Sequence, residues 1–401
     1  MTIASGIFKK VAFKVETTWG TAATAAGAQY LRRVTSNLNL TKATYESNEI
    51  RDDQQVADFR HGTRSVTGSV NGELSGGTHQ AFVEAMLRAD ATAVATIAAL
   101  TLTTAAAAPN YTITRSAGSW ITDGIRVGMV VRVSAGLNAL TLNRNFYVVS
   151  LTATVMTVNA LDNGTITIES AVASCSVIIP GKRTFVPSTG HTNKSYTIEE
   201  WHSDIGNLSR LFVGCKPSQM AIKMPATGMS TIDLSFMGKD ITVGTTQYFT
   251  TPTAIGTSGI MAAVNGSVFV QGVEVALITG LDLTIAGGHT AGNVIGANTT
   301  PDVFPGRIKG SGQATVYLLD SSFLNYFVNE TEVEIVAILT ATTASNSDFV
   351  VVHLPRVKFG GATADDGEKG LIQTMPFVVL KKAVTVGYDS TEISIQDSLY
   401  V

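Results

Sequence analysis

The side chains best suited to chemistry are few in this chain and lie far apart. No two of the six histidines have metal-ligand spacing on one predicted element, and neither Cys175 nor Cys215 belongs to a CxxC motif. The GxSxG turn of serine nucleophiles and the GxxxxGK[ST] loop that cradles phosphates are both absent from the sequence. Residue types and spacing therefore predict no catalytic, cofactor-binding or metal site, and we expect that the protein is not an enzyme.

Two short patterns resemble ligand sites but are better explained as turns. The glycine-rich stretch Gly287–Gly292 is not followed by the strand and helix that a nucleotide site requires. The acidic stretch Asp365–Glu368 could bind Ca²⁺, but an EF-hand loop needs more ligands at fixed offsets, which favours an acidic turn. Cys175 and Cys215 lie in apolar contexts typical of reduced core thiols, with a disulfide between them as the alternative.

A strand, a glycine turn and a short helix follow one another between residues 56 and 88. From Val66 to Leu74 apolar or small residues alternate with polar ones, a period of two that gives the strand one dry face and one wet face. Three small residues, 75–77, end the strand, and Thr78 can cap a helix with one apolar side.

The same pattern occurs again between residues 302 and 328. Alternation runs from Ile308 to Leu318, and a helix capped by residues 320–322 follows. Gly62 precedes the first strand and Gly306 the second, so the two copies lie 244 positions apart. The apolar side of the second helix is expected to consist of Phe323, Leu324, Phe327 and Val328. A repeat of this period predicts two tandem domains, and coincidence is the alternative.

A differently composed segment separates the first helix from the strands that should follow it. Residues 91–108 are rich in Ala and Thr and low in complexity, and short strands then recur at roughly ten-residue spacing. The expected strands are Tyr111–Thr114, Gly128–Val133, Phe146–Leu151, Val155–Val158, Thr165–Ile168 and Cys175–Ile179. The later strands of the two copies are offset by about 140 positions instead of 244, as an insertion of this length in the first copy predicts.

Composition limits the classes of protein that remain. Charged residues make up 15% of the 401 residues, below the usual quarter of a globular protein. This low fraction indicates that part of the protein surface is covered by partner molecules. The alternative is that the chain is simply rich in strands made of Ala, Thr and Gly. The net charge of −3 predicts no general affinity for nucleic-acid phosphates. No run of about eighteen apolar residues occurs, so no membrane span is expected, and the N-terminus lacks the apolar core of a secretory signal.

The repeat and the insertion together predict the domain organisation. The expected parts are a first domain formed by residues 1–90 and 182–243, an inserted small β-barrel-like domain at 91–181, a linker at 244–259, a second domain at 260–386 and a C-terminal tail at 387–401.

Four segments resemble the major tail tube proteins of bacteriophages with long, non-contractile tails. They are Glu16–Thr21, the polar loop leading to Gly62, Val66–Val70 and Ser235–Lys239. The resemblance covers most of residues 1–90 and 182–390. The segment 91–181 is similar to the small β-barrel insertions of some of these proteins.

The resemblance implies a mainly β fold with two tandem tail-tube-type antiparallel β-sandwich domains, each with a flanking short helix, plus the small all-β insertion. It implies a structural protein of the virion tail, assembled in the host cytoplasm, whose rings stack into a tube. That tube would enclose the tape measure protein, conduct DNA at infection, and meet tail terminator and distal tail proteins at its ends. Two domains per chain favour a ring of three chains with pseudo-sixfold symmetry over six chains. A multi-domain β adhesin or carbohydrate-binding surface protein is the alternative.

Two sets of residues are candidates for the assembly and the bore. The loop Thr44–His61 is densely charged, and we expect it to contact a neighbouring subunit or ring because one loop cannot satisfy all its charges internally. These charges are Glu46, Glu49, Arg51, Asp52, Asp53, Asp58 and Arg60. The polar faces of the two repeated strands are expected to line the lumen: Ser65, Thr67, Ser69, Asn71, Glu73, Arg307, Lys309, Ser311, Gln313 and Thr315. Arg307 and Lys309 should be paired with acidic residues of an adjoining loop, since an unpaired cation would grip DNA phosphates.

Overall fold

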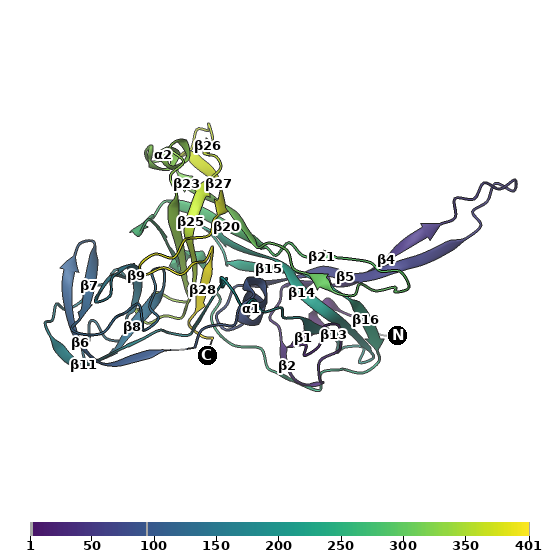
Figure 1. Ribbon diagram of the computed structural model, residues 1–401, viewed down its shortest axis with the longest axis horizontal. Helices are drawn as coiled ribbons and strands as arrows, with labels where there is room; N and C mark the ends of the chain where they lie inside the picture. The colour runs from purple at the N-terminus through teal and green to yellow at the C-terminus, as the bar shows by residue number, and fades with distance from the viewer. Residues whose placement is uncertain (1–2, 94, 401) are drawn as a thin grey trace.

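The computed structural model describes residues 3–93 and 95–400, and this part of the chain is mainly β. It contains 28 strands and two α-helices. A closed barrel lies at one end of the molecule, a long hairpin projects from the other, and the strands of the second domain rise between them (Figure 1).

The first domain is an antiparallel arrangement of strands that are distant in sequence. Its strands pair in the order β4 (Asn39–Glu46), β5 (Phe59–Glu73), β15 (Thr231–Gly238), β14 (Leu208–Pro225), β13 (Tyr196–His202) and β1 (Lys9–Val15). The long strand β14 belongs to both sheets of a sandwich, because its first half pairs with β13 and β16 (Asp240–Gly244) and its second half with β15. As the alternation predicts, Val66 and Val70 of β5 are buried in the core.

The second domain repeats this order of pairing. Its strands pair in the order β20 (Ile278–Ala286), β23 (Lys309–Tyr317), β27 (Ile372–Val379), β25 (Phe349–Phe359), β24 (Val333–Thr340) and β18 (Ser267–Val270). A bulge near Val333 in the β24–β25 ladder matches a bulge near Tyr196 in the β13–β14 ladder. We followed the strand pairings from these bulges across each domain, from β14 through β15 to β5 and from β25 through β27 to β23. Thr67 and Ser311 then occupy equivalent positions, and they are 244 residues apart, the offset found in the sequence. The predicted fold class is thus confirmed.

The two domains are joined by a strand pair. Residues Gln219–Pro225 of β14 pair antiparallel with Gly280–Ala286 of β20. A continuous sheet therefore runs β4–β5–β15–β14–β20–β23–β27 through both domains. Alternate residues of the joint point into one shared core, where Met220, Ile222, Leu281 and Leu283 are at most 2% exposed. Each such side chain contributes about 1.5–3 kcal/mol on burial.

The two helices differ in their surroundings. Helix α1 (Gln80–Leu87) packs against β14 and β12 (Lys182–Phe185), and all its residues except Ala81 are buried. Helix α2 (Ser322–Val328) has no buried residue. Phe323 packs beside Tyr326 on the core, but the rest of the predicted apolar side, Leu324, Phe327 and Val328, is exposed. Nothing in the described chain covers this side of α2.

The inserted segment forms a closed six-stranded barrel. The order around it is β10 (Val155–Ala160), β7 (Asn110–Arg115), β6 (Thr96–Ala107), β11 (Val172–Ile178), β8 (Val130–Ala135) and β9 (Asn145–Leu151). One expectation is wrong here, because Thr165–Ile168 is not a strand. The low-complexity Ala/Thr stretch, in which the sequence pattern predicts no strand, contains β6. Ala has weak strand propensity, so β6 exists because the barrel needs a strand between β7 and β11 to close.

The barrel rests on an apolar patch of the second domain. Tyr147 of the barrel lies against Phe269, with ring centroids 4.5 Å apart. We call the second domain's contribution to this contact the docking patch: Phe269, Val336, Ile338, Phe349 and Val351. The last strand, β28 (Ser394–Asp397), pairs with both β12 and β25 and so joins the segment that follows the barrel to the second domain.

Candidate assembly surfaces

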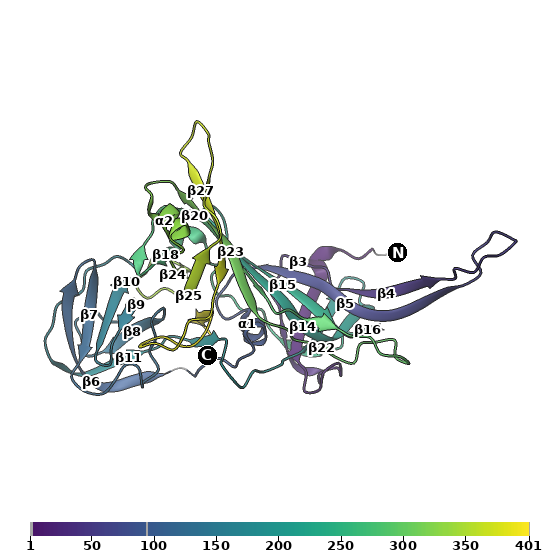
Figure 2. The same ribbon diagram turned by 45° about the horizontal axis from the view of Figure 1, so that its top comes forward.

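The charged loop forms the end of a long projecting arm. We call the hairpin of β4, β5 and the loop between them the arm; it extends away from both domains (Figures 1 and 2). Arg51 pairs with Asp53 at 3.0 Å and Arg60 with Asp58 at 2.7 Å. The expectation that the loop cannot satisfy its charges internally is therefore wrong for both arginines. The hydrogen bond from Arg51 also holds the pKa of Asp53 below its usual value.

Three of the arm's carboxylates form no ion pair within the described residues: Glu46, Glu49 and Asp52. The arm also carries exposed apolar side chains, Tyr45, Val56, Phe59 and a fully exposed Ile50. In the other domain, the loop between β20 and β23 carries the fully exposed Ile295. Apolar side chains displayed this way mark surfaces that contact another protein.

The polar face of the continuous sheet contains the candidate lumen residues of β5. Ser65, Thr67, Ser69, Asn71 and Glu73 lie on the side opposite the buried Val66 and Val70, and all are half-buried or exposed. On β23, Lys309, Ser311 and Gln313 are exposed and Thr315 is half-buried.

The same face carries few charges, of both signs. The register brings Glu73, Asp233 and Asp282 to it, together with Lys223 and Lys309. Lys223 lies directly opposite Asp282 across the joint of the two domains. With Arg307, the exposed neighbour of Lys309, three basic side chains balance three acidic ones, so this face has no net charge per chain.

Arg307 and Lys309 lie at the start of β23 beside Ala286 and Gly288. Both are exposed, and within residues 3–93 and 95–400 neither forms an ion pair. The structure of one chain thus brings no acidic partner to either cation.

The Glu16–Thr21 segment fastens the N-terminal strand to the bend of β14. The Glu16 carboxylate is 8% exposed and accepts hydrogen bonds from the backbone N–H groups of Gly20 (2.9 Å) and Gly214 (2.7 Å). It also accepts from the hydroxyls of Ser195 (2.7 Å) and Thr197 (3.0 Å). Four donors on one buried carboxylate fix the turn, since each would otherwise be unsatisfied.

Trp19 completes this contact. Its Nε1 donates to the carbonyl of Gly214 at 3.2 Å, and the ammonium groups of Lys216 and Lys239 lie 5.6 and 5.1 Å from its ring centroid. Gly214 has φ +71°, and a Cβ there would press against Trp19 and Lys239. The segment therefore has a structural role, at the point where β14 passes from one sheet to the other.

Two edges of the continuous sheet are open. In the described chain, no strand pairs with the outer edge of β4 or with the outer edge of β26 (Thr363–Ala364), which pairs only with β27. Residues 363–370 are all exposed. Beside β4, the carbonyls of Ser36 and Leu38 accept hydrogen bonds from the side chains of Lys9 and Arg210. A sheet edge without a neighbouring strand is a template for pairing with another chain.

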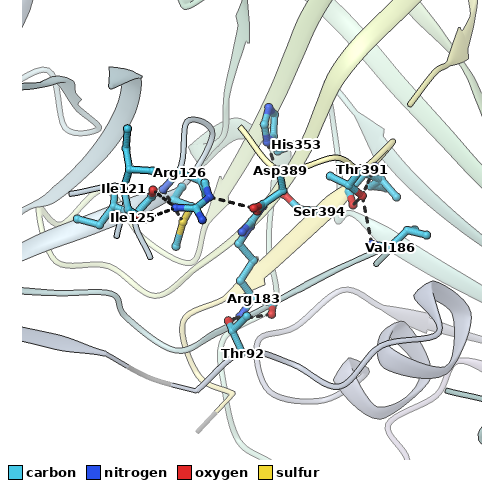
Figure 3. Close-up of polar contacts among 12 residues, drawn as sticks. Thr92, Ile121, Ile125, Arg126, Arg183, Val186, His353, Asp389, Thr391 and Ser394 are labelled. Atoms are coloured by element: carbon cyan, nitrogen blue, oxygen red, sulfur yellow. Dashed lines mark hydrogen bonds and ion pairs between the residues drawn. The ribbon is translucent and has the colours of Figure 1, made fainter. Parts of the chain in front are cut away.

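A three-way ionic contact fixes the barrel, β12 and the C-terminal segment together (Figure 3). The Asp389 carboxylate lies 2.9 Å from Nε of Arg126 in the barrel and 2.7 Å from Nη2 of Arg183 on β12. Burial tends to raise the pKa of Asp389, but Arg183 and Arg126 outweigh burial and hold the pKa below its usual value. Sequence reasoning missed this cluster, because its members are far apart in the chain and share no local pattern.

Histidines and acidic groups serve the structure in the described chain. Nε2 of the buried His353 lies 2.8 Å from Oε1 of Glu334, and the Tyr388 hydroxyl donates to the other Glu334 oxygen at 2.8 Å. Burial lowers the pKa of His79 and of His289 to about 4. Among the described residues, no cluster of three or more His, Cys, Asp or Glu side chains could hold a metal ion, and neither helix has the length and apolarity to cross a membrane.

Comparison with known proteins identifies the family of the chain. No curated protein matches the chain significantly. A family model described as phage tail tube protein matches residues 9–379, nearly the whole chain, and it confirms the resemblance seen in the sequence. The chain belongs to the phage tail tube protein family and is a structural protein of the phage tail.

Proposed function

We propose that this chain is the ring-forming unit of the tail tube of a phage with a long, non-contractile tail. The observation that carries the proposal is the continuous sheet, which passes through both domains and ends in two open edges. Each chain supplies two equivalent domains, so three chains close a ring of six domains with pseudo-sixfold symmetry. A ring of six chains is the alternative.

The polar face of the sheet lines the bore in this proposal. Hydroxyl and amide side chains of β5 and β23 cover most of it, and its charges nearly cancel. Each phosphate neutralised by a protein cation strengthens DNA binding, so a wall without a cationic excess lets DNA pass. The tube encloses the tape measure protein before infection and conducts DNA during it, with no sequence-specific contact to either.

The other surfaces serve stacking and the tube ends. The arm, with its unpaired carboxylates and exposed Ile50, contacts the neighbouring ring. Tail terminator and distal tail proteins cover the two ends of the tube. The barrel lies on the exterior, because a domain of its size in the bore would obstruct DNA. The protein assembles in the host cytoplasm, becomes part of the virion and catalyses no reaction.

Electron microscopy of concentrated purified protein tests the proposal. Hollow tubes built of regularly stacked rings are the expected result. Particles that remain single under all assembly conditions, and that bind a glycan, would instead support a surface adhesin.

A further inference from the structure

We infer that residues 361–367 of one chain pair with residues 35–41 of a second copy, in an antiparallel register where the two residue numbers add up to 402. The inference rests on the proposed function and specifies the joint between neighbouring chains of a ring. It comes from the joint inside the chain, because each side of that joint has an equivalent segment with an edge to which no strand pairs in the described residues. On the segment 35–41, the carbonyls of Ser36 and Leu38 accept hydrogen bonds from the side chains of Lys9 (2.7 Å) and Arg210 (3.0 Å), which a pairing strand would replace.

The acceptor side is the continuation of β25. The β14–β15 ladder shifts register by one residue between Pro217 and Gln219. The ladder of β25 and β26 with β27 shifts by one residue after Phe359, at the equivalent place. When residues are counted along β14 and β25 from their matching bulges, Gly361–Gly367 correspond to Gln219–Pro225. Gln219–Pro225 is the segment of β14 that pairs with β20 inside the chain.

The donor side is the segment formed by β3 (Thr35–Ser36) and the start of β4. β3 and the start of β4 pair with β5 in the same register, with Thr35 opposite Asn71 and Asn39 opposite Thr67. In the second domain, β20 pairs with β23 in the corresponding register, with Thr284 opposite Ser311, the equivalent of Thr67. Thr35–Thr41 are therefore equivalent to Gly280–Ala286, with an offset of 245. Transferring the pairing of β14 with β20 sets Gly361 opposite Thr41 and Gly367 opposite Thr35.

The side chains fit this register. Residue numbers that add up to 402 bring Ala362 opposite Leu40 and Ala364 opposite Leu38, so apolar side chains meet on the core side. Thr363 then lies opposite Asn39 on the polar side. A slip by one residue would turn every side chain of one strand to the wrong face, so the match excludes one-residue slips. A slip by two residues keeps the faces, and the equivalence with the pairing of β14 and β20 selects against it.

Helix α2 gives an independent reason for a partner at this place. The backbone N–H of Ala89 bonds to Glu84 after α1, and that of Thr331 bonds to Tyr326 after α2, which makes Arg88 and Glu330 equivalent. Arg88 donates to the carbonyls of Gly287 and Gly306, both at 2.6 Å, and so holds the second domain's loop over the end of α1.

The equivalents of Gly287 and Gly306 in a neighbouring chain are Lys42 and Gly62. The joint therefore brings Lys42 of the neighbour toward Glu330, which already pairs with Lys358 at 2.5 Å on the surface, and covers the end of α2. Exposed Leu324, Phe327 and Val328 lie on this helix, whereas α1, already beside such a loop, is buried. The exposure of α2 is what one side of an unfilled joint would display.

Cysteine cross-linking tests the register. A disulfide needs Cα atoms within about 4.4–6.8 Å, which directly opposed residues satisfy and diagonal neighbours do not. We would make the double variants Thr363→Cys with Asn39→Cys and Asp366→Cys with Ser36→Cys, one from each of the two alternating kinds of antiparallel pair. The control is Thr363→Cys with Thr41→Cys, on the same face but one pair out of register. Each single variant is a further control, and native Cys175 and Cys215 are buried.

Oxidation of assembled tubes should convert at least one in-register variant into covalent dimers and closed trimers that reducing agent dissolves, with at least tenfold less product from the control. Rings without such product from either in-register variant, or with equal product from the control, would overturn the register while leaving the tube proposal intact. Absence of any ring would overturn the proposed function itself.

Hydrogen–deuterium exchange of the unmodified protein gives a second test that needs no variant. Amides of residues 35–41 and 361–367 should exchange at least tenfold more slowly in tubes than in free chains. Tubes in which both segments exchange as fast as in the free chain would contradict the inference.

Discussion

Replacing Asp389 by Asn should loosen the contact between the barrel, β12 and the C-terminal segment. The Arg183 side chain is 5% exposed and Asp389 is 17% exposed, so this ion pair is largely shielded from water. Burial lowers the pKa of Arg183, yet the guanidinium stays charged and loses Asp389, its one anionic partner among the described residues, in the variant. Breaking a buried ion pair by removing one partner costs about 3–5 kcal/mol.

The geometry favours the lower end of that range. The contact between Arg183 and Asp389 has the distance of an ion pair but not an aligned hydrogen bond, and Arg126 is 23% exposed and can reach water. We therefore expect Asp389→Asn to lower the free energy of unfolding by about 3 kcal/mol. The matched control is Asp53→Asn, whose partner Arg51 is 44% exposed, so that its replacement should change the free energy of unfolding far less.

Urea unfolding of the unassembled chain at pH 7, followed by circular dichroism and by tryptophan fluorescence, to which the buried barrel residue Trp120 contributes, measures both variants. The pH dependence adds a check of the cause. Because the folded pKa of Asp389 is lowered, its contribution is complete above the unfolded pKa of about 3.9 and is lost as the pH falls through the folded pKa. The difference between wild type and Asp389→Asn should shrink in that range. Equal stabilities of the Asp389→Asn and Asp53→Asn variants at pH 7 would refute the reasoning.

Three further predictions concern other parts of the molecule. Glu16→Ala leaves three buried donors and the half-buried Gly20 N–H without an acceptor and should lower the free energy of unfolding by at least ~3 kcal/mol, whereas Glu16→Gln, which keeps one acceptor oxygen, should cost less. Urea titrations of the two variants compare them, and equal losses would speak against the carboxylate's role. Reversing Arg51 and Arg60 to Glu should shorten tubes in electron micrographs while changing the stability of the free chain by only about 1 kcal/mol or less. Unchanged tube lengths would argue that the arm's charges do not act in stacking. Deleting residues 91–181 should cause aggregation because it uncovers the docking patch, and the same deletion with polar replacements in that patch should restore soluble, tube-forming protein as judged by light scattering and microscopy. A folded, soluble double change that forms no tubes would show that the barrel is needed for assembly.

The repeated domain could be predicted from sequence because its signal is local. Alternation along Val66–Leu74 and Ile308–Leu318 survives in each copy, and the offset of 244 reappears in the strand register. A period of two follows directly from which face of a strand is buried, so it needs no knowledge of distant residues.

The remaining features depend on parts of the chain that are distant in sequence. Strand β6 is rich in Ala and Thr and exists because the barrel closes around it. Helix α2 is amphipathic, but whether its apolar side is buried depends on what lies over it, which the described chain does not supply. Asp389 meets Arg126 from 263 positions away, a separation at which no periodicity carries information.

The central claim concerns how the continuous sheet is arranged in the assembled tube. An electron cryomicroscopy reconstruction of the tube, viewed along its axis, tests it most directly. We predict a closed inner barrel made of six domains from three chains, with Thr67 and Ser311 facing the bore. An inner wall formed by the opposite face, with Val66 and Val70 toward the bore, would contradict the account.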